Sequence, residues 1–274
     1  MTITELISKA FTEDIPTTDK TTDSLGIKER FGISQLIAKQ DLTLSGKDFF
    51  QEAVHFIDPN LNIQWNFNDG DKILDRQIIA QIDGNLVELL KAERVALNFL
   101  GYFSGIATMT SLFVKACEGT SCKILDTRKT LPLYRAFVKK AVLHGGGTNH
   151  RMNLSDGILI KENHLALASG LKSAIAMAKA QNPELPIEVE TKDLEEVRLA
   201  VEAQAQRIML DNMSLEQTAK ALEIIPENIE TEASGNMTLD RIPSVAQTGV
   251  NFISVGALTH SAPCADMSLL FEWN

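Results

Sequence analysis

Six short apolar runs, each followed by a polar tip and then by a helical pattern, constrain the fold of this chain more than any other feature. They all lie downstream of Cys122 and cover 123–126, 157–160, 187–190, 207–211, 229–233 and 251–255. Helical patterns fill the intervals, at 132–143, 171–180, 194–203, 215–224 and 239–247. This alternation is typical of β–α units around a parallel sheet. Because the repeat is one of architecture and not of residues, it favours a barrel over a solenoid.

The first third of the chain has a different pattern. Strand-like stretches at 35–38 and 62–67 are separated by turn signals at 68–70 and 83–85, and a long helix begins near Leu86. We therefore predict an α/β chain of two domains, the first over 1–107 and the barrel over 108–264. The tail, 265–274, is expected to pack back on the first domain.

The charge balance excludes several classes of partner. The net charge is −10 and the pI is about 5.0, so the long-range field repels phosphate, and we expect neither nucleic acid nor an anionic membrane as a partner. The three cysteines lack a metal-binding spacing, which predicts buried reduced thiols in a cytoplasmic protein and no zinc site.

The stretch 95–114 carries no charge and contains Gly101-x-x-x-Gly105, which is similar to a packing motif of membrane helices. Polar residues interrupt the stretch, and the N-terminus lacks the features of a signal peptide. We therefore predict a buried or interface helix in a soluble protein.

In parallel β/α barrels the loops after the strands build the active site, so the residues just beyond each apolar run are the candidates. They are Arg128, Lys129, Lys161, Glu190, Asp211, Ser234, Gly235, Asn236, Gly256 and Ala257. The glycine-rich loop 145–151 adds His150 and Arg151. Taken singly, each basic residue is better explained as a solvated rim charge. Together, in an acidic protein, they predict a binding site for a multiply charged anion.

The remaining candidates suggest further chemistry. Glu190 and Asp211 are hard oxygen ligands suited to Mg²⁺ held largely through substrate and water, although either could instead cap the following helix. The small residues of the last two loops suit phosphate binding. His164 and His260 follow strands and could reach the pocket, whereas His144 is expected to cap its helix. No serine or cysteine stands in a nucleophile elbow or beside a partnered histidine, so the sequence does not support covalent catalysis by either.

Four segments carry a more specific signal. They are Glu93-Arg94-Val95-Ala96-Leu97-Asn98, Asp126-Thr127-Arg128-Lys129-Thr130, Gly145-Gly146-Gly147-Thr148-Asn149-His150-Arg151 and Leu159-Ile160-Lys161-Glu162-Asn163-His164. In this order they resemble quinolinate phosphoribosyltransferases, and the resemblance covers about Asn66 to His260. It implies an N-terminal α/β sandwich followed by an incomplete, seven-stranded β/α barrel. The segment Thr18-Asp19-Lys20-Thr21 departs from the family's usual Gly-Asp-x-Thr.

The resemblance also implies an activity and a site. The reaction would join quinolinate to phosphoribosyl pyrophosphate (PRPP) with loss of CO2, on the route to NAD. The residues implied for quinolinate are Arg94, Arg128, His150, Arg151 and Lys161. Those implied for PRPP chemistry and Mg²⁺ are Lys129, Glu190 and Asp211, and those for the phosphate are Ser234, Gly235, Asn236, Gly256, Ala257 and His260. A homodimer or larger homo-oligomer is implied, with Arg94 entering the neighbour's site.

Three alternatives stay open at this stage. The first is a relative of the same fold with another aromatic or phosphorylated substrate, including relatives found beside molybdate transport. The second is a Schiff-base lyase using Lys161, since a lone lysine at a barrel strand tip suits an aldolase. The third is a binding protein without catalytic activity.

Overall fold

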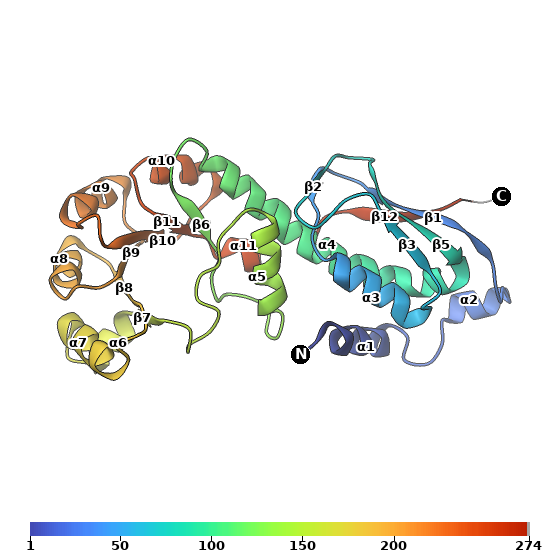
Figure 1. Cartoon of the computed structure of the whole chain (residues 1–274), viewed down its shortest axis with the longest axis horizontal. Coiled ribbons are helices and arrows are strands. Elements are labelled where there is room, and N and C mark those ends of the chain that lie inside the picture. The colour runs from blue at the N-terminus through green and yellow to red at the C-terminus, as the bar shows by residue number, and fades with distance from the viewer. Residues whose placement is uncertain (273–274) are drawn as a thin grey trace. The chain divides into compact units, whose positions relative to one another are not determined.

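The computed structural model describes residues 1–272 and divides into two compact units (Figure 1). The first unit comprises 1–111, 137–146 and the described residues from 262 onward, and the second comprises 112–136 and 147–261. The second unit is therefore interrupted by a short return to the first.

The first unit is built on a four-stranded antiparallel sheet with the order β12-β1-β5-β3. Its strands are β1 (Phe31–Ala38), β3 (Asn62–Trp65), β5 (Ile78–Asn85) and β12 (Met267–Phe271). The short strands β2 (Leu42–Thr43) and β4 (Lys72–Ile73) form a separate pair. The helices are α1 (Ile3–Asp14), α2 (Lys20–Leu25), α3 (Lys47–Ile57) and most of α4 (Leu86–Ala116). The tail thus supplies an edge strand, with Leu269 opposite Leu36.

The two predicted turns of this unit have different outcomes. The turn at Asn68 is confirmed, because the Asp71 amide donates to the Asn68 carbonyl and Gly70 has a φ of 95°. The turn expected at 83–85 is wrong, since these residues end β5. Gly84 is required there for another reason: a Cβ would lie 2.8 Å from a methyl carbon of Leu61, so the glycine permits close packing.

Phenylalanine side chains dominate the core of the first unit. The rings of Phe49, Phe99, Phe103 and Phe137 pack against one another with centroids 4.8–6.4 Å apart. Such pairs add to the stabilisation that comes from the apolar area they bury. Phe137 belongs to α5 (Arg135–His144), which explains why the segment 137–146 joins this unit.

Helix α4 is the one described helix that is long and apolar enough to cross a membrane. Within the structure 61% of its most apolar window is buried, as expected for the core helix of a soluble protein. Its glycine motif packs against the chain's own C-terminal segment. A Cβ on Gly105 would lie 2.0 Å from the Pro263 carbonyl oxygen, and the Ala265 amide donates to the Gly101 carbonyl at 2.9 Å. The motif therefore serves packing within the chain.

The second unit contains a six-stranded parallel sheet with the order β6-β11-β10-β9-β8-β7. The strands are β6 (Lys123–Leu125), β7 (Ile158–Ile160), β8 (Ile187–Thr191), β9 (Arg207–Asp211), β10 (Glu230–Ser234) and β11 (Phe252–Ser254). All six predicted runs are confirmed to within one or two residues. The family resemblance implies seven strands. In the described part of the chain, the seventh is represented by an isolated parallel bridge between Leu125 and Thr148.

Helices cover one face of this sheet, as Figure 1 shows. They are α6 (Glu162–Leu167), α7 (Leu171–Gln181), α8 (Leu194–Glu202), α9 (Leu215–Ile224), the short 3₁₀ turn η1 (Leu239–Arg241) and α10 (Ile242–Ala246). The final helix, α11 (Ala257–His260), follows β11. Helix α6 was not predicted, because a six-residue helix directly after a strand has too few turns to show a period.

The helix caps decide one open question about the two candidate carboxylates. Asp193 caps α8 by accepting from the amides of Glu195 and Glu196, and Ser214 caps α9 through a capping box with Gln217. Since both helices have other caps, the alternative that Glu190 and Asp211 act as helix caps is wrong.

Candidate active site

A cavity of about 820 Å³ opens at the carboxyl ends of the strands in the second unit. Its walls follow the period of two that a strand imposes on its side chains. The pairs that line it from single strands or their tips are Leu159 and Lys161, Met209 and Asp211, Glu232 and Ser234, and Ser254 and Gly256. The face of the sheet opposite the helices is therefore the face of the site.

Basic side chains form much of the wall of this cavity. Arg128, Lys129, His150, Arg151 and Lys161 all line it. Arg151 donates from its guanidinium to the Gly157 carbonyl at 2.7 Å, which restricts its direction. Burial and the neighbouring Arg128 lower the pKa of Arg151, a sign that this cluster of positive charge favours an anion.

Two carboxylates face these cations. Glu190 is paired with Lys161, and Asp211 accepts a hydrogen bond from the Asn212 side chain at 2.8 Å. Both carboxylates are only partly buried and lie on adjacent strands β8 and β9. Hard oxygen donors that remain accessible to a polyphosphate fit Mg²⁺, which commonly keeps waters and substrate oxygens as ligands.

The loops after β9 and β10 are locked together by residues with unusual backbone angles. Asn212, Gly235 and Asn236 have φ values of 54°, 91° and 50°. A Cβ on Gly235 would lie 2.2 Å from the Asn212 side-chain oxygen, so glycine is required. Asn236 donates to the same oxygen at 3.0 Å, and Arg241 donates to the carbonyls of Gly235 and Met213. Strained residues held by such bonds are common at functional sites.

The loop after β6 is held to the last helix. The Thr259 hydroxyl donates to the Lys129 carbonyl at 2.7 Å. A Cβ on Gly256 would lie 3.2 Å from His260 Nε2 and 3.3 Å from Lys129 Cδ, so these two side chains converge above the glycine. Lys129 and His260 thus form a second polar corner of the cavity, next to Gly256.

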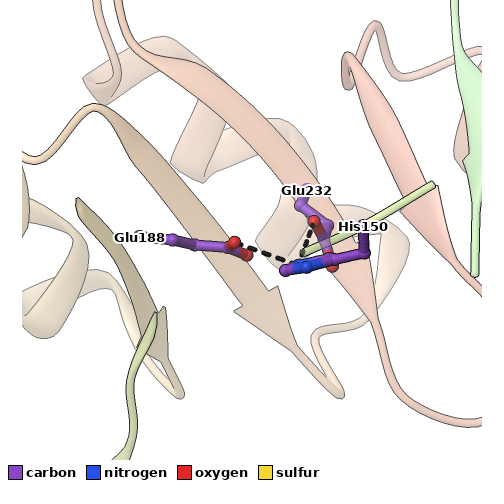
Figure 2. A group of neighbouring side chains, drawn as sticks. All are labelled: His150, Glu188 and Glu232. Carbon is purple, nitrogen blue, oxygen red and sulfur yellow. Dashed lines mark ion pairs between the residues drawn. The ribbon is translucent and has the colours of Figure 1, made fainter. Parts of the chain in front are cut away.

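Beneath the cations lies a buried polar cluster, shown in Figure 2. His150 Nε2 is 3.0 Å from a Glu188 carboxylate oxygen and 3.5 Å from a Glu232 oxygen. Glu188 is 6% exposed and Glu232 is fully buried. Burial, with the neighbouring Glu188, raises the pKa of Glu232 to about 8, so this carboxyl group is protonated at neutral pH.

The structure brings together every predicted site residue except Arg94. The others all line the cavity, including Asn236, Ala257 and His260. Arg94 lies exposed on α4, in the first unit. His164, which was considered for the pocket, instead accepts a hydrogen bond from the Lys161 amide through Nδ1.

Two other expectations for polar residues are resolved. His144 was expected to cap its helix, but its Nδ1 contacts the Ser45 hydroxyl at 2.8 Å. Cys264 is exposed, which contradicts the expectation of buried thiols, while Cys117 and Cys122 are buried and all three are free.

Sequence reasoning missed Asn212, Glu188 and Glu232. A signal for the two glutamates was present, since Glu188 stands two residues before Glu190 and Glu232 two before Ser234. In a strand such spacing places the side chains on one face, so the inner layer of the site was readable from alternation. Asn212 gave no comparable signal, because its role depends on a positive φ.

This arrangement defines a class of protein, the β/α-barrel enzymes that act on anionic substrates at the strand ends. Comparison with known families then identifies the branch. The model for the C-terminal domain of quinolinate phosphoribosyl transferase matches residues 106–270, and the model for its N-terminal domain matches 19–104. The chain belongs to the quinolinate phosphoribosyl transferase family.

Curated relatives and solved structures agree with this assignment. A probable nicotinate-nucleotide pyrophosphorylase (carboxylating) of Bacillus subtilis is 39% identical over 97% of this chain and 92% of its own length. A chloroplastic nicotinate-nucleotide pyrophosphorylase of Arabidopsis thaliana is 40% identical over 86% of this chain and 73% of its own. The solved nicotinate-nucleotide pyrophosphorylase of Francisella tularensis has a TM-score of 0.95 and 38% identity, covering 98% of this chain and 96% of that one.

Proposed function

We propose that this protein joins quinolinate to PRPP and releases CO2 and pyrophosphate, giving nicotinate mononucleotide for NAD biosynthesis. The observation that carries the proposal is the single cavity in which guanidinium and ammonium groups face two accessible carboxylates. The relatives named above carry this activity in their names. Quinolinate, a dianionic ring, requires the cationic groups of this site. PRPP, a sugar polyphosphate that binds with Mg²⁺, requires the carboxylates.

Quinolinate is assigned to the cationic side. Arg128 and Arg151 offer planar forks that suit a carboxylate, while Lys161 serves as a point charge. The one polar atom of the pyridine ring, its nitrogen, must stay free to attack the ribose, so the two carboxylates set the orientation of the ring. Arg151 is already restrained by its bond to Gly157, which limits the reorganisation needed on binding.

PRPP is assigned to the opposite side. Glu190 and Asp211 would hold Mg²⁺ through water and the pyrophosphate, and the bound ion would supply positive charge to the departing pyrophosphate. Ser234, Gly235 and Asn236 are assigned to the 5′-phosphate together with Gly256, Ala257 and His260. Lys129 stands between these groups and the cationic side, where it can contact the pyrophosphate.

The reaction then needs no covalent intermediate with the protein. The pyridine nitrogen attacks the anomeric carbon of the ribose as the bond to pyrophosphate breaks, and Glu190 and Asp211 stabilise the positive charge that develops on the sugar. The ribosylated nitrogen is cationic. When the neighbouring carboxylate leaves as CO2, its bonding electron pair remains on the ring carbon beside that cation, and this carbon then takes a proton.

We also propose a cytoplasmic homodimer or larger homo-oligomer in which Arg94 of one copy completes the site of another. The exposure of Arg94, outside the cavity of its own chain, supports this assignment. Mixing Arg94→Ala protein with Lys161→Ala protein should restore part of the activity in hybrid dimers. A lack of recovery despite demonstrated subunit exchange would overturn the shared site.

The direct test is incubation of the purified protein with quinolinate, PRPP and Mg²⁺, with nicotinate as the control substrate. Nicotinate mononucleotide should form from quinolinate and not from nicotinate. Turnover of nicotinate alone, or of neither acid, would contradict the proposal. The lyase alternative has less support, because Lys161 contacts Glu190 instead of lying in the apolar pocket that activates a lysine amine.

A further inference from the structure

The inner layer of the site contains the buried carboxyl groups of Glu188 and Glu232, and the proposed chemistry does not explain why they are there. The interior of a β/α barrel is usually filled by branched apolar side chains, whereas here Glu188 and Glu232 lie buried on that face. A buried carboxyl group destabilises a fold unless its partners compensate. Neither residue is among those assigned to quinolinate, PRPP or Mg²⁺. Their retention in the barrel therefore points to a role through the side chain they contact, His150.

The hydrogen bonds around His150 specify its tautomer. Nδ1 accepts from the Arg151 backbone amide at 2.7 Å, so this nitrogen carries no proton. The proton of the neutral ring must then be on Nε2, which lies 3.0 Å from Glu188 and 3.5 Å from Glu232 (Figure 2). The His150 amide in turn donates to Asp126 at 2.9 Å. Both ring nitrogens are thus engaged with the protein.

The same tautomer argues against a metal at this cluster. The donor atoms of His150, Glu188 and Glu232 lie within 4.8 Å of one another, which is close enough to consider one. However, an imidazole nitrogen binds a metal through a lone pair, and Nε2 uses that position for its proton while Arg151 occupies the lone pair of Nδ1. The cluster is therefore a support for His150, made by the close contacts of its ring with Glu188 and Glu232.

We propose that Glu188, assisted by Glu232, is a positioning residue that holds His150 in the Nε2–H tautomer so that Nδ1 fixes the backbone of Arg151. This inference rests on the proposed function for its substrate. Its consequence is that His150 assists quinolinate binding through the placement of the Arg151 guanidinium. The arrangement follows the general pattern in which the partner of one ring nitrogen decides what the other can do.

Other charged groups lie near these side chains. On β9, Arg207 approaches Glu232 at 3.6 Å and pairs more closely with Glu230 at 2.7 Å. On the loop after β6, Asp126 accepts a hydrogen bond from the His150 backbone amide. Glu188 is therefore the acceptor nearest to Nε2, and it is the residue whose removal should release the ring.

The tautomer can be measured without any assay of turnover. The protein has five histidines, so ¹⁵N spectra of the labelled imidazoles are tractable, and His150→Gln assigns the signal of interest. The wild type and Glu188→Gln should both show the Nε2–H form for His150, since glutamine retains an acceptor oxygen. Glu188→Leu should show a mixture of tautomers. An Nδ1–H form in the wild type would overturn the proposal even if Glu188→Leu does not fold.

Kinetics provide the second readout. Glu188→Leu should raise the KM for quinolinate by roughly tenfold or more, with a smaller change in kcat and none in the KM for PRPP. Glu188→Gln should stay close to the wild type. The matched control is Glu227→Gln, an exposed carboxylate shortly before β10, which should change neither parameter. Equal losses in Glu188→Leu and Glu188→Gln would contradict the positioning role, whereas absence of turnover in the wild type would contradict only the proposed function.

Discussion

The interiors of the two units are filled differently. The first unit has a core of packed phenylalanine rings, with Phe49 at its centre, whereas the sheet of the second unit carries Glu188 and Glu232 on its inner face. Apolar burial stabilises a fold directly, and burial of carboxyl groups opposes it. The contrast indicates that the buried carboxyl groups lower the stability of the second unit where its inner face supports the site. Such a loss is expected of functional sites in general.

The largest effect on this difference between the two units is expected when the buried carboxyl group of Glu232 is removed. The pKa of Glu232 is raised to about 8 from an ordinary 4.5, so the folded state keeps a proton that the unfolded state releases. Stability linked to this group is therefore fully present below pH 4.5 and is lost as the pH rises to about 8. Glu232→Gln should be more stable than the wild type by roughly 2–5 kcal/mol at pH 8, and the difference should shrink in acid.

Chemical denaturation of both proteins between pH 5 and pH 8.5 checks this. The control is Glu227→Gln, which lacks the burial of Glu232 and should follow the wild type. A constant difference between Glu232→Gln and the wild type across this range would show that Glu232 does not titrate as described.

The second prediction concerns the cationic layer. Arg128→Ala or Arg151→Ala should each raise the KM for quinolinate about 10- to 100-fold, because a charge-assisted contact contributes roughly 1.5–3 kcal/mol. The far-ultraviolet spectrum should be unchanged. Arg198→Ala, on the exposed surface of α8, is the control for loss of an arginine. Unchanged kinetics in both cavity variants would remove the carboxylate clamp.

The third prediction tests the apolar packing of the first unit. Gly105→Ala should lower the free energy of unfolding by about 1–3 kcal/mol, because its Cβ would overlap the Pro263 carbonyl. Gly101→Ala is the matched variant on the same helix, with a contact of 2.9 Å in place of 2.0 Å, and should be affected less. Thermal melts of both variants show which substitution destabilises the protein more. A reversed order would contradict the close approach of this segment.

The smallest effect is expected for an exposed ion pair in the first unit. Lys140 and Asp48 lie 2.9 Å apart with side chains 54% and 60% exposed. Asp48→Asn should change stability by less than about 1 kcal/mol, because solvent screens such pairs. A larger loss, measured by denaturant titration, would show that charges in the first unit matter as much as those in the second.

Much of the second unit was predictable because its strands are short, apolar and bounded by polar tips. The bounds of β9 and α9 match their predicted ranges, and the residues at the strand ends of that unit meet in one cavity. What sequence reasoning could not supply depends on tertiary contacts. The turn predicted at Gly84 was wrong, because the glycine there is needed for close packing against Leu61.

The inner layer of the site was missed for a related reason. A glutamate inside a strand looks unfavourable on its own, and only the position of His150 above β8 and β10 explains Glu188 and Glu232. His150 itself was assigned to the substrate, since its contacts with Arg151 and Glu188 depend on a loop whose path the sequence does not reveal.

The central claim is that cationic side chains at the barrel mouth recognise the two carboxylates of one ring. Calorimetric titration of the purified protein with quinolinate and with nicotinate, which has a single carboxylate, tests it directly. Quinolinate should bind at least about tenfold more tightly, and Arg151→Ala should lose most of that preference. Equal affinities for the two acids in the wild type would contradict the account.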